Sequence, residues 1–202
     1  MNKKFESSSN LFGLVLLGGK STRMGQDKSC LNYHGKSQLD YMKEILTPFC
    51  AELFFSGRKD QAPSSSRWIS DKLEYADIGP LTGILSAMEE HPGKSWIVLA
   101  VDLPFVTEKT LEYLIENRDP QKIATVFRSN HDSLPEPLCA VWEGHGLVKI
   151  KELFAQGIRC PRKILINSDV CLLEQKDKRW LDNVNTPAEF EQALKTIKHE
   201  RP

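Results

Sequence analysis

Short apolar runs recur along the chain and alternate with stretches of helical periodicity. Strands are expected at seven runs, residues 13–17, 52–56, 68–70, 96–102, 123–127, 138–142 and 170–174. Apolar residues spaced three and four apart predict amphipathic helices over 39–46, 81–88 and 111–115. Strands that alternate with helices in this way are typical of an α/β protein, here a Rossmann-like three-layer sandwich with a mostly parallel central sheet.

Two segments give the most specific structural predictions. The run WIVLAV, residues 96–101, is apolar throughout, as in a central strand that helices cover on both faces, so we expect it in mid-sheet. The sequence Thr186-Pro187-Ala188-Glu189 offers an N-cap hydroxyl, a proline at the first helical position and a glutamate at the third. It predicts a final helix that continues through Ile197.

Composition and charge narrow the class of protein. The 202 residues fit one globular domain, with residues 1–10 expected as a flexible tail. The 27 basic and 27 acidic residues cancel, so no overall field attracts nucleic acid or an anionic membrane. No run approaches the roughly 20 apolar residues of a membrane span. The five cysteines form no CxxC pair, which favours reduced thiols and a cytoplasmic location over a disulfide framework or a zinc site.

The loop after the first predicted strand, LLGGKSTRMGQDKS, combines glycines with cations. Gly18 and Gly19 would let backbone N–H groups approach an anion closely, and Lys20, Arg23 and Lys28 add positive charge. The spacing matches neither the P-loop nor the dinucleotide-binding fingerprint. Each cation alone could be a solvated surface residue, but together they predict a polyphosphate site.

This loop resembles the signature loop of the nucleotidyltransferases that include molybdenum cofactor guanylyltransferase. Four further segments resemble family motifs in the same order, namely GPLTGI at 79–84, VDLPF at 101–105, EPLCAV at 136–141 and NVNTP at 183–187. The likeness covers most of the chain. It implies the nucleotide-diphospho-sugar transferase type of fold and a Mg²⁺-dependent transfer of GMP from GTP to molybdopterin-bound molybdenum, with release of pyrophosphate.

The resemblance also assigns residues to the nucleotide. Arg23 and Lys28 would face the triphosphate and the departing pyrophosphate, and Asp71 would accept hydrogen bonds from guanine. Gly79 would let the backbone approach the base or ribose. The remaining nucleotide-binding positions are Leu16, Leu17, Gly18 and Gly19. For Asp71 and Gly79, a solvent-facing loop aspartate and a plain turn glycine are the alternatives.

Other residues are assigned to the metal and the acceptor. Asp102 ends the central strand, where a carboxylate could offer a hard oxygen to Mg²⁺; a turn or helix-cap role is the alternative. Asn183 and Asn185 lie two apart in an extended stretch, so both side chains would project from one side, near the acceptor in the family; ordinary loop asparagines are the alternative. The nucleotide would bind the N-terminal half and the acceptor the C-terminal half.

Two departures from the family pattern and two rival functions remain. Leu17 replaces the usual alanine, and the spacing from Met24 to Lys28 is one residue shorter than in some members. One rival is a cytidylyltransferase that uses CTP with molybdopterin or another phosphorylated acceptor. The other is a non-catalytic nucleotide-binding or docking protein. Proteins that deliver the cofactor and molybdoenzymes that receive it are possible partners. The basic residues 159–163 are expected as a solvated turn, and contact with a pterin phosphate is the alternative.

Overall fold

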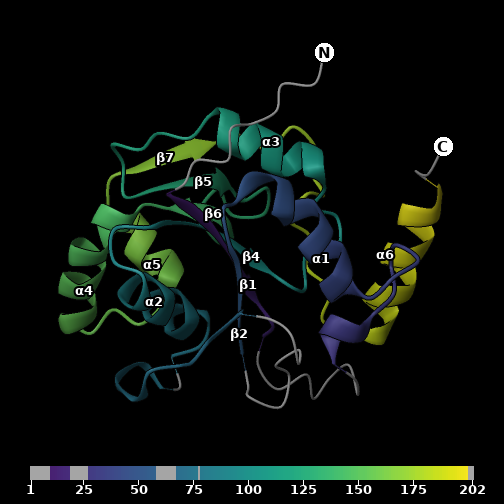
Figure 1. Ribbon diagram of the computed structural model, residues 1–202. Helices are drawn as coiled ribbons and strands as arrows, with labels where there is room; N and C mark the ends of the chain where they lie inside the picture. Colours follow the sequence, from purple (N-terminus) through teal and green to yellow (C-terminus); the bar gives the residue numbers. More distant parts are fainter. Residues whose placement is uncertain (1–9, 19–26, 58–66, 77, 200–202) are drawn as a thin grey trace.

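A seven-stranded sheet forms the centre of the computed structural model, which describes residues 10–18, 27–57, 67–76 and 78–199 (Figure 1). The strands are β1 (Leu11–Leu16), β2 (Leu53–Ser56), β3 (Arg67–Ile69), β4 (Ser95–Ala100), β5 (Ala124–Arg128), β6 (Pro135–Trp142) and β7 (Val170–Leu173). Their order is β3-β2-β1-β4-β6-β5-β7. All pairs are parallel except those of β6, which runs antiparallel to β4 and β5. The seven predicted strands and the mostly parallel sheet are confirmed.

Helices cover both faces of the sheet. They are α1 (Gln38–Leu46), α2 (Pro80–Glu90), α3 (Glu108–Glu116), α4 (Leu147–Ala155), α5 (Pro161–Ile166) and α6 (Pro187–His199). One face carries α2, α4 and α5, the other carries α1 and α3, and α6 lies outside α1 (Figure 1). The predicted three-layer sandwich is therefore confirmed. Within the described segments, no helix is both long and apolar enough to cross a bilayer.

The central strand and the last helix agree with their predictions. Strand β4 is the fourth of seven and all six of its residues are buried, with β1 parallel on one side and β6 antiparallel on the other. It ends at Ala100, two residues before Asp102. At the start of α6, Glu189 N donates to Thr186 Oγ1 at 3.3 Å and Thr186 N donates to Glu189 Oε2 at 3.1 Å, which is the predicted capping box.

Prolines misled the sequence interpretation at two places. The basic residues 159–163 are not only a turn, because Pro161 occupies the first position of α5, whose Ile164 and Leu165 are buried. Pro135 and Pro137 lie before the predicted strand at 138–142 but belong to β6. β6 pairs with β4 only over residues 139–142. Both prolines lie outside that pairing, so the N–H groups that they lack remove no hydrogen bond to β4.

The N-terminal tail can be judged only at its last residue. Asn10 Nδ2 donates to the Gly93 carbonyl at 3.2 Å, and Ser95 N donates to the Asn10 carbonyl at 3.0 Å. Asn10 is thus fixed beside β4, while residues 1–9 lie outside the described residues.

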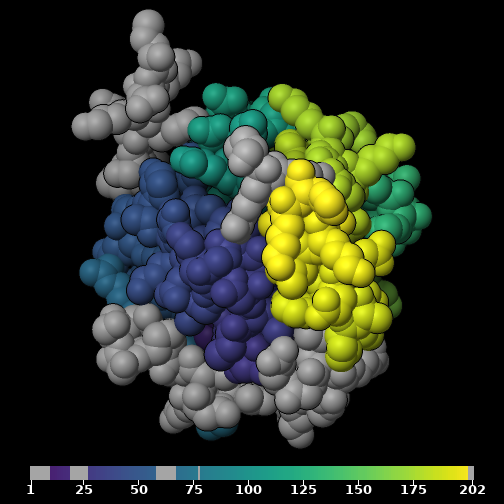
Figure 2. Space-filling view, turned by 90° about the vertical axis from the view of Figure 1, so that its right-hand side faces the viewer, coloured from purple at the N-terminus to yellow at the C-terminus, as the bar shows by residue number. Residues whose placement is uncertain are grey.

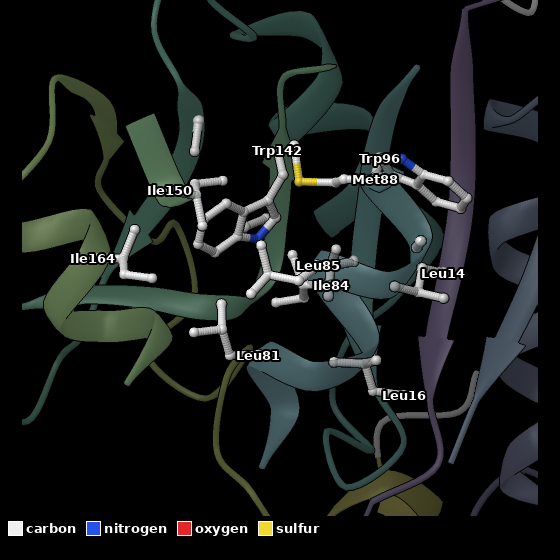
Figure 3. Packing of buried hydrophobic residues seen from close by; sticks show 14 of the residues in the cluster. Leu14, Leu16, Leu81, Ile84, Leu85, Met88, Trp96, Trp142, Ile150 and Ile164 are labelled. Carbon is white, nitrogen blue, oxygen red and sulfur yellow. The ribbon is translucent and has the colours of Figure 1, made fainter. Parts of the chain in front are cut away.

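Close packing of α2 on the sheet brings the start of this helix to the edge where β1 and β2 end. Leu81, Ile84, Leu85 and Met88 of α2 pack in one buried cluster with side chains of β1, β4 and β6 (Figure 3). At Gly83 an added Cβ would lie 2.5 Å from Ser56 Oγ and 2.8 Å from Leu16 Cδ2. Glycine at this position therefore allows the short distance between helix and sheet.

Candidate active site

The chemically interesting residues gather where the parallel strands end. Gly18 follows β1, Ser56 is the last residue of β2, Asp71 follows β3 and Asp102 follows β4. These four strands are parallel neighbours, so their carboxyl ends form one edge of the sheet. In open α/β folds this edge is where ligands bind.

Three predicted site residues from distant parts of the sequence meet at this edge and form what we call the lysine cluster: Lys28, Asp102 and Asn185. The Lys28 ammonium group donates to Asp102 Oδ2 at 3.1 Å and to Asn185 Oδ1 at 2.5 Å. The Lys28 side chain is 13% exposed and that of Asp102 24%, so the ion pair is partly shielded from water. A single cation, from the short 3-10 helix at residues 28–30, thus joins the end of β4 to the segment before α6.

Local structure on both sides holds the lysine cluster in place. Asp27 Oδ1 accepts from Ser29 N at 2.9 Å and from Ser29 Oγ at 2.7 Å, which caps the short 3-10 helix η1 (Lys28–Cys30). On the other side, Val184 N donates to the Asp102 carbonyl at 2.9 Å, and the Val184 side chain is buried. Lys28 and Asn185 therefore project from anchored backbone.

The donor set around Asp102 fits a hard cation such as Mg²⁺. Asp102 Oδ2 accepts from Lys28, whereas Oδ1 has no hydrogen-bond partner among the described residues. Within those residues no group of three or more His, Cys, Asp or Glu side chains could hold a metal. Mg²⁺ is commonly held by one or two carboxylates together with substrate phosphates and water, so a single aspartate beside bound phosphates would be sufficient.

A second carboxylate, Asp71, lies further along the same edge. Ser56 Oγ donates to Asp71 Oδ1 at 3.2 Å, and Ser56 is buried between β1 and β3. Although Asp71 as a residue is exposed, its carboxyl end turns toward this serine. Burial of the carboxyl group raises the pKa of Asp71, and the Ser56 hydrogen bond offsets part of that rise.

Gly79 and Gly18 have backbone conformations that favour glycine. Gly79 has φ 69° and ψ −141° at the N-cap of α2, and Gly18 has φ 82° after β1. An added Cβ would meet nothing within 4 Å at either position, so it is the backbone angle that requires glycine there. Both residues present main chain at the edge that carries Asp71 and Asp102.

The leucines of the predicted nucleotide loop contribute to the core with their side chains. Leu16 and Leu17 are 6% and 1% exposed and pack on opposite faces of the sheet. The Leu16 carbonyl accepts from Val101 N at 3.0 Å, and Leu17 N donates to the Ser56 carbonyl at 2.8 Å. A ligand at this point can therefore reach backbone atoms only, and the leucine in place of the family alanine fills core volume.

The remaining predicted residues are less constrained. Asn183 is exposed, and its amide makes no hydrogen bond within the part of the chain that the structure describes. The buried Val184 lies between Asn183 and Asn185, as expected if both amides project from the other side of this extended stretch. Gly19 and Arg23 lie outside the described residues, so their roles stay predictions.

Ser56 is a site residue that the sequence analysis missed. Its only signal was its place as the last residue of a predicted strand, at the edge where ligands bind. A serine at a strand end is common, and its contact with Asp71 depends on the pairing of β2 with β3.

Comparison with known proteins identifies the family of the chain. Residues 13–170 match the family model described as the MobA-like NTP transferase domain. A molybdenum cofactor biosynthesis bifunctional protein of Synechocystis is 32% identical over 194 residues, which cover 92% of this chain and 54% of that protein. The chain thus spans about half the length of that relative.

Two further similarities extend over nearly whole chains. A probable molybdenum cofactor guanylyltransferase of Bacillus cereus is 26% identical over 197 residues, covering 93% of this chain and 98% of that protein. The crystal structure of molybdopterin-guanine dinucleotide biosynthesis protein A from Archaeoglobus fulgidus shares the fold, with a TM-score of 0.72 at 24% identity over 93% of this chain and 99% of that one. The chain belongs to the family of MobA-like NTP transferase domains and is a nucleotidyltransferase.

Proposed function

We propose that the protein transfers GMP from GTP to the molybdopterin-bound molybdenum cofactor and releases pyrophosphate in a Mg²⁺-dependent reaction. The observation that carries the proposal is the lysine cluster, in which one cation, one carboxylate and one amide converge at the carboxyl edge of the sheet. The names of the Synechocystis and Bacillus cereus relatives favour this acceptor and this nucleotide.

The reaction requires positioning more than covalent work by the protein. A terminal phosphate oxygen of the acceptor attacks the α-phosphorus of GTP, the new P–O bond forms, and the bond to the β-phosphate breaks so that pyrophosphate leaves. Lys28, held by two hydrogen bonds, offers a fixed positive charge to the phosphate oxygens. When bound through Asp102 and the phosphates, Mg²⁺ would neutralise their charge.

The two substrates would approach the lysine cluster from different halves of the chain. Lys28, Asp71 and Gly79 come from the N-terminal half and would bind the nucleotide, whereas Asn183 and Asn185 come from the C-terminal half and would face the acceptor. Asp102 follows β4, the strand that joins the β1 side of the sheet to β6. We infer one catalytic domain with the reacting phosphates between its halves.

Guanine selection is assigned to Asp71. An ionised carboxylate can accept hydrogen bonds from guanine N1–H and from its amino group, and within the described residues no cation pairs with Asp71 to compete for its oxygens. The cellular setting belongs to the proposal as well. All five cysteines are free thiols, as expected in the reducing cytoplasm, where delivery proteins and acceptor molybdoenzymes would be partners.

The test is pyrophosphate release by the purified protein with Mg²⁺, the molybdenum cofactor and each nucleoside triphosphate in turn. Pyrophosphate release is expected only when GTP is the nucleoside triphosphate. As the control, the release with GTP should stop when the acceptor is omitted. Release with CTP would support the cytidylyltransferase instead. If GTP raises the melting temperature but no mixture turns over, the protein is a non-catalytic nucleotide binder.

A further inference from the structure

The turn that leads into α6 has one hydrogen bond more than a helix cap needs. In a capping box the glutamate at the third helical position accepts from the N–H of the N-cap residue, here Thr186. The same oxygen, Glu189 Oε2, also accepts from Asn185 N at 2.7 Å, which is the shorter of the two contacts. Asn185 precedes the N-cap, so its N–H is not among the helix donors that require a cap. The extra bond therefore fixes Asn185 itself.

Asn185 is the residue of this turn that belongs to the lysine cluster. Its Oδ1 accepts from Lys28 at 2.5 Å, and Lys28 in turn contacts Asp102. On the side away from Glu189, the backbone of the preceding Val184 donates to the Asp102 carbonyl. The short stretch that presents the Asn185 amide is thus fastened at one end to Asp102 and at the other to Glu189.

Helix α6 is attached to the rest of the molecule by apolar contacts that do not involve Glu189. Ala193 and Ile197 of this helix are buried with Leu31, and the Phe190 ring meets the Tyr33 ring at 5.0 Å between centroids. In the space-filling view the helix lies directly against the purple segment that follows η1 (Figure 2). Glu189 itself is exposed and contributes nothing to this packing. Its removal should therefore leave α6 docked.

We propose that Glu189 is a positioning residue, which acts through the backbone of Asn185 and Thr186 to hold the Asn185 amide in the lysine cluster. This inference rests on the proposed function, since the amide is useful only if phosphates react beside Lys28. The carboxylate would touch neither substrate. Its effect passes through two N–H bonds to the amide of a neighbouring residue.

The first test compares Glu189→Ala with Glu189→Gln and a matched control, Glu191→Ala. Loss of the two acceptor contacts should lower kcat by about tenfold to hundredfold in Glu189→Ala, the size expected for a slightly misplaced catalytic group. Glu189→Gln should keep most of the activity, because an amide oxygen can accept the same two N–H groups. Glu191 lies on the same helix, is exposed and makes no side-chain hydrogen bond or ion pair within the described residues, so its variant should match wild type.

The second test separates positioning from helix stability. In an Asn185→Ala background the Glu189→Ala loss should vanish, since no amide is left to position. An equal loss in that background, or an equal loss in Glu189→Gln, would overturn the proposal.

A readout independent of turnover uses protein labelled with ¹⁵N-asparagine. The Asn185 side-chain resonance, identified by its absence in Asn185→Ala, should shift in Glu189→Ala and stay in place in Glu191→Ala. An unmoved resonance in Glu189→Ala would refute the positioning role. If wild type turned over no nucleotide, the proposed function would fail, yet this spectrum would still decide whether Glu189 holds the amide.

Discussion

Two aspartates occupy equivalent places after β3 and β4, two parallel strands of the same sheet, but differ in their surroundings. Asp102 pairs with the Lys28 ammonium group and lies in a cluster drawn from three distant segments. Asp71 has one hydroxyl partner, Ser56, and no cation among the described residues. The first environment balances charge and suits phosphates and a metal ion. The second leaves carboxylate oxygens available to N–H donors of a neutral base, which suits recognition.

The difference also concerns stability. Asp102 forms an ion pair with Lys28 in the folded protein, whereas burial makes the charged form of Asp71 unfavourable and raises its pKa. A carboxylate kept in an unfavourable place on the rim of a ligand-binding edge is a candidate for function. We therefore propose a role in the chemistry for Asp102 and a role in nucleotide selection for Asp71, so variants of each should give different kinetic signatures.

The largest effect is expected for Asp102→Asn. Loss of the carboxylate charge beside the reacting phosphates should lower kcat by about a thousandfold, at the upper end of single-residue electrostatic effects. The replacement has the same size, so the fold should be kept, and the melting temperature should not exceed that of wild type because the ion pair with Lys28 is lost. Pyrophosphate release and a thermal melt measure the two quantities.

A matched control for Asp102 lies elsewhere in the sheet. Asp169 forms an exposed ion pair with Lys122 at 2.8 Å just before β7 begins, so it lies at the amino end of a strand that is parallel to β5. Asp169→Asn removes an aspartate–lysine pair without touching the carboxyl edge and should retain wild-type turnover. Similar activity in the Asp102 and Asp169 variants would remove Asp102 from the mechanism.

Lys28→Met should have the next largest effect, with kcat/KM for the nucleotide lower by about a hundredfold. Arginine at this position should restore little, because a planar guanidinium group cannot replace a compact ammonium group that contacts both Asp102 and Asn185. Steady-state kinetics with varied GTP measure the effect. Full activity in Lys28→Arg would mean that only net charge matters at this position, and the geometric part of the comparison would fail.

A smaller and qualitatively different effect is expected for Asp71→Asn. An asparagine amide cannot accept both guanine donors as a carboxylate can, so the preference for GTP over other triphosphates should fall by about tenfold to hundredfold. Maximal turnover at saturating GTP should change much less. The measurement is the ratio of kcat/KM values for GTP and CTP. An unchanged ratio together with a large fall in kcat would make Asp71 a second chemical residue and would abolish the contrast with Asp102.

The sequence could predict much of the edge because strand ends carry a strong signal. Apolar runs located β1 and β4, and parallel strands place the residues that follow them at one edge, so Lys28 and Asp102 could be assigned to one site. Asn185 is 157 residues away from Lys28, and no local pattern predicts their hydrogen bond. Only the family motif at 183–187 indicated that Asn185 belongs to the site.

The parts that escaped prediction depend on tertiary contacts. The residues around Pro161 were predicted to form a solvated turn. Burial of Ile164 and Leu165 stabilises a helix there that local propensity alone does not predict. Glu189 was visible as a helix cap, yet its bond to Asn185 N needs the geometry of the turn. Local sequence determines where elements start, whereas neighbouring elements determine which side chains they bring together.

The smallest expected effect is a change in thermal stability, which distinguishes Asp71 from Asp102 without a measurement of activity. Because burial raises the pKa of Asp71 above the usual 3.8, the folded state favours the protonated form. The stabilising contribution of that form is fully present below pH 3.8 and is lost as the pH rises through the raised folded-state pKa. At pH 7 the ionised carboxylate therefore destabilises the folded state. Asp71→Asn, which places a neutral group of the same size there, should melt at a higher temperature than wild type.

Water still reaches the exposed side of Asp71, so the gain at pH 7 should be only about 1 °C, and it should disappear toward pH 3.8 as the wild-type carboxyl group protonates. Thermal melts of both proteins from pH 3.5 to pH 8 measure the difference. Asp102→Asn is the contrasting variant and should show no gain at pH 7, because it loses the ion pair with Lys28. If Asp71→Asn melted below wild type at pH 7, contacts of the ionised carboxylate would outweigh its burial, and Asp71 would resemble Asp102 after all.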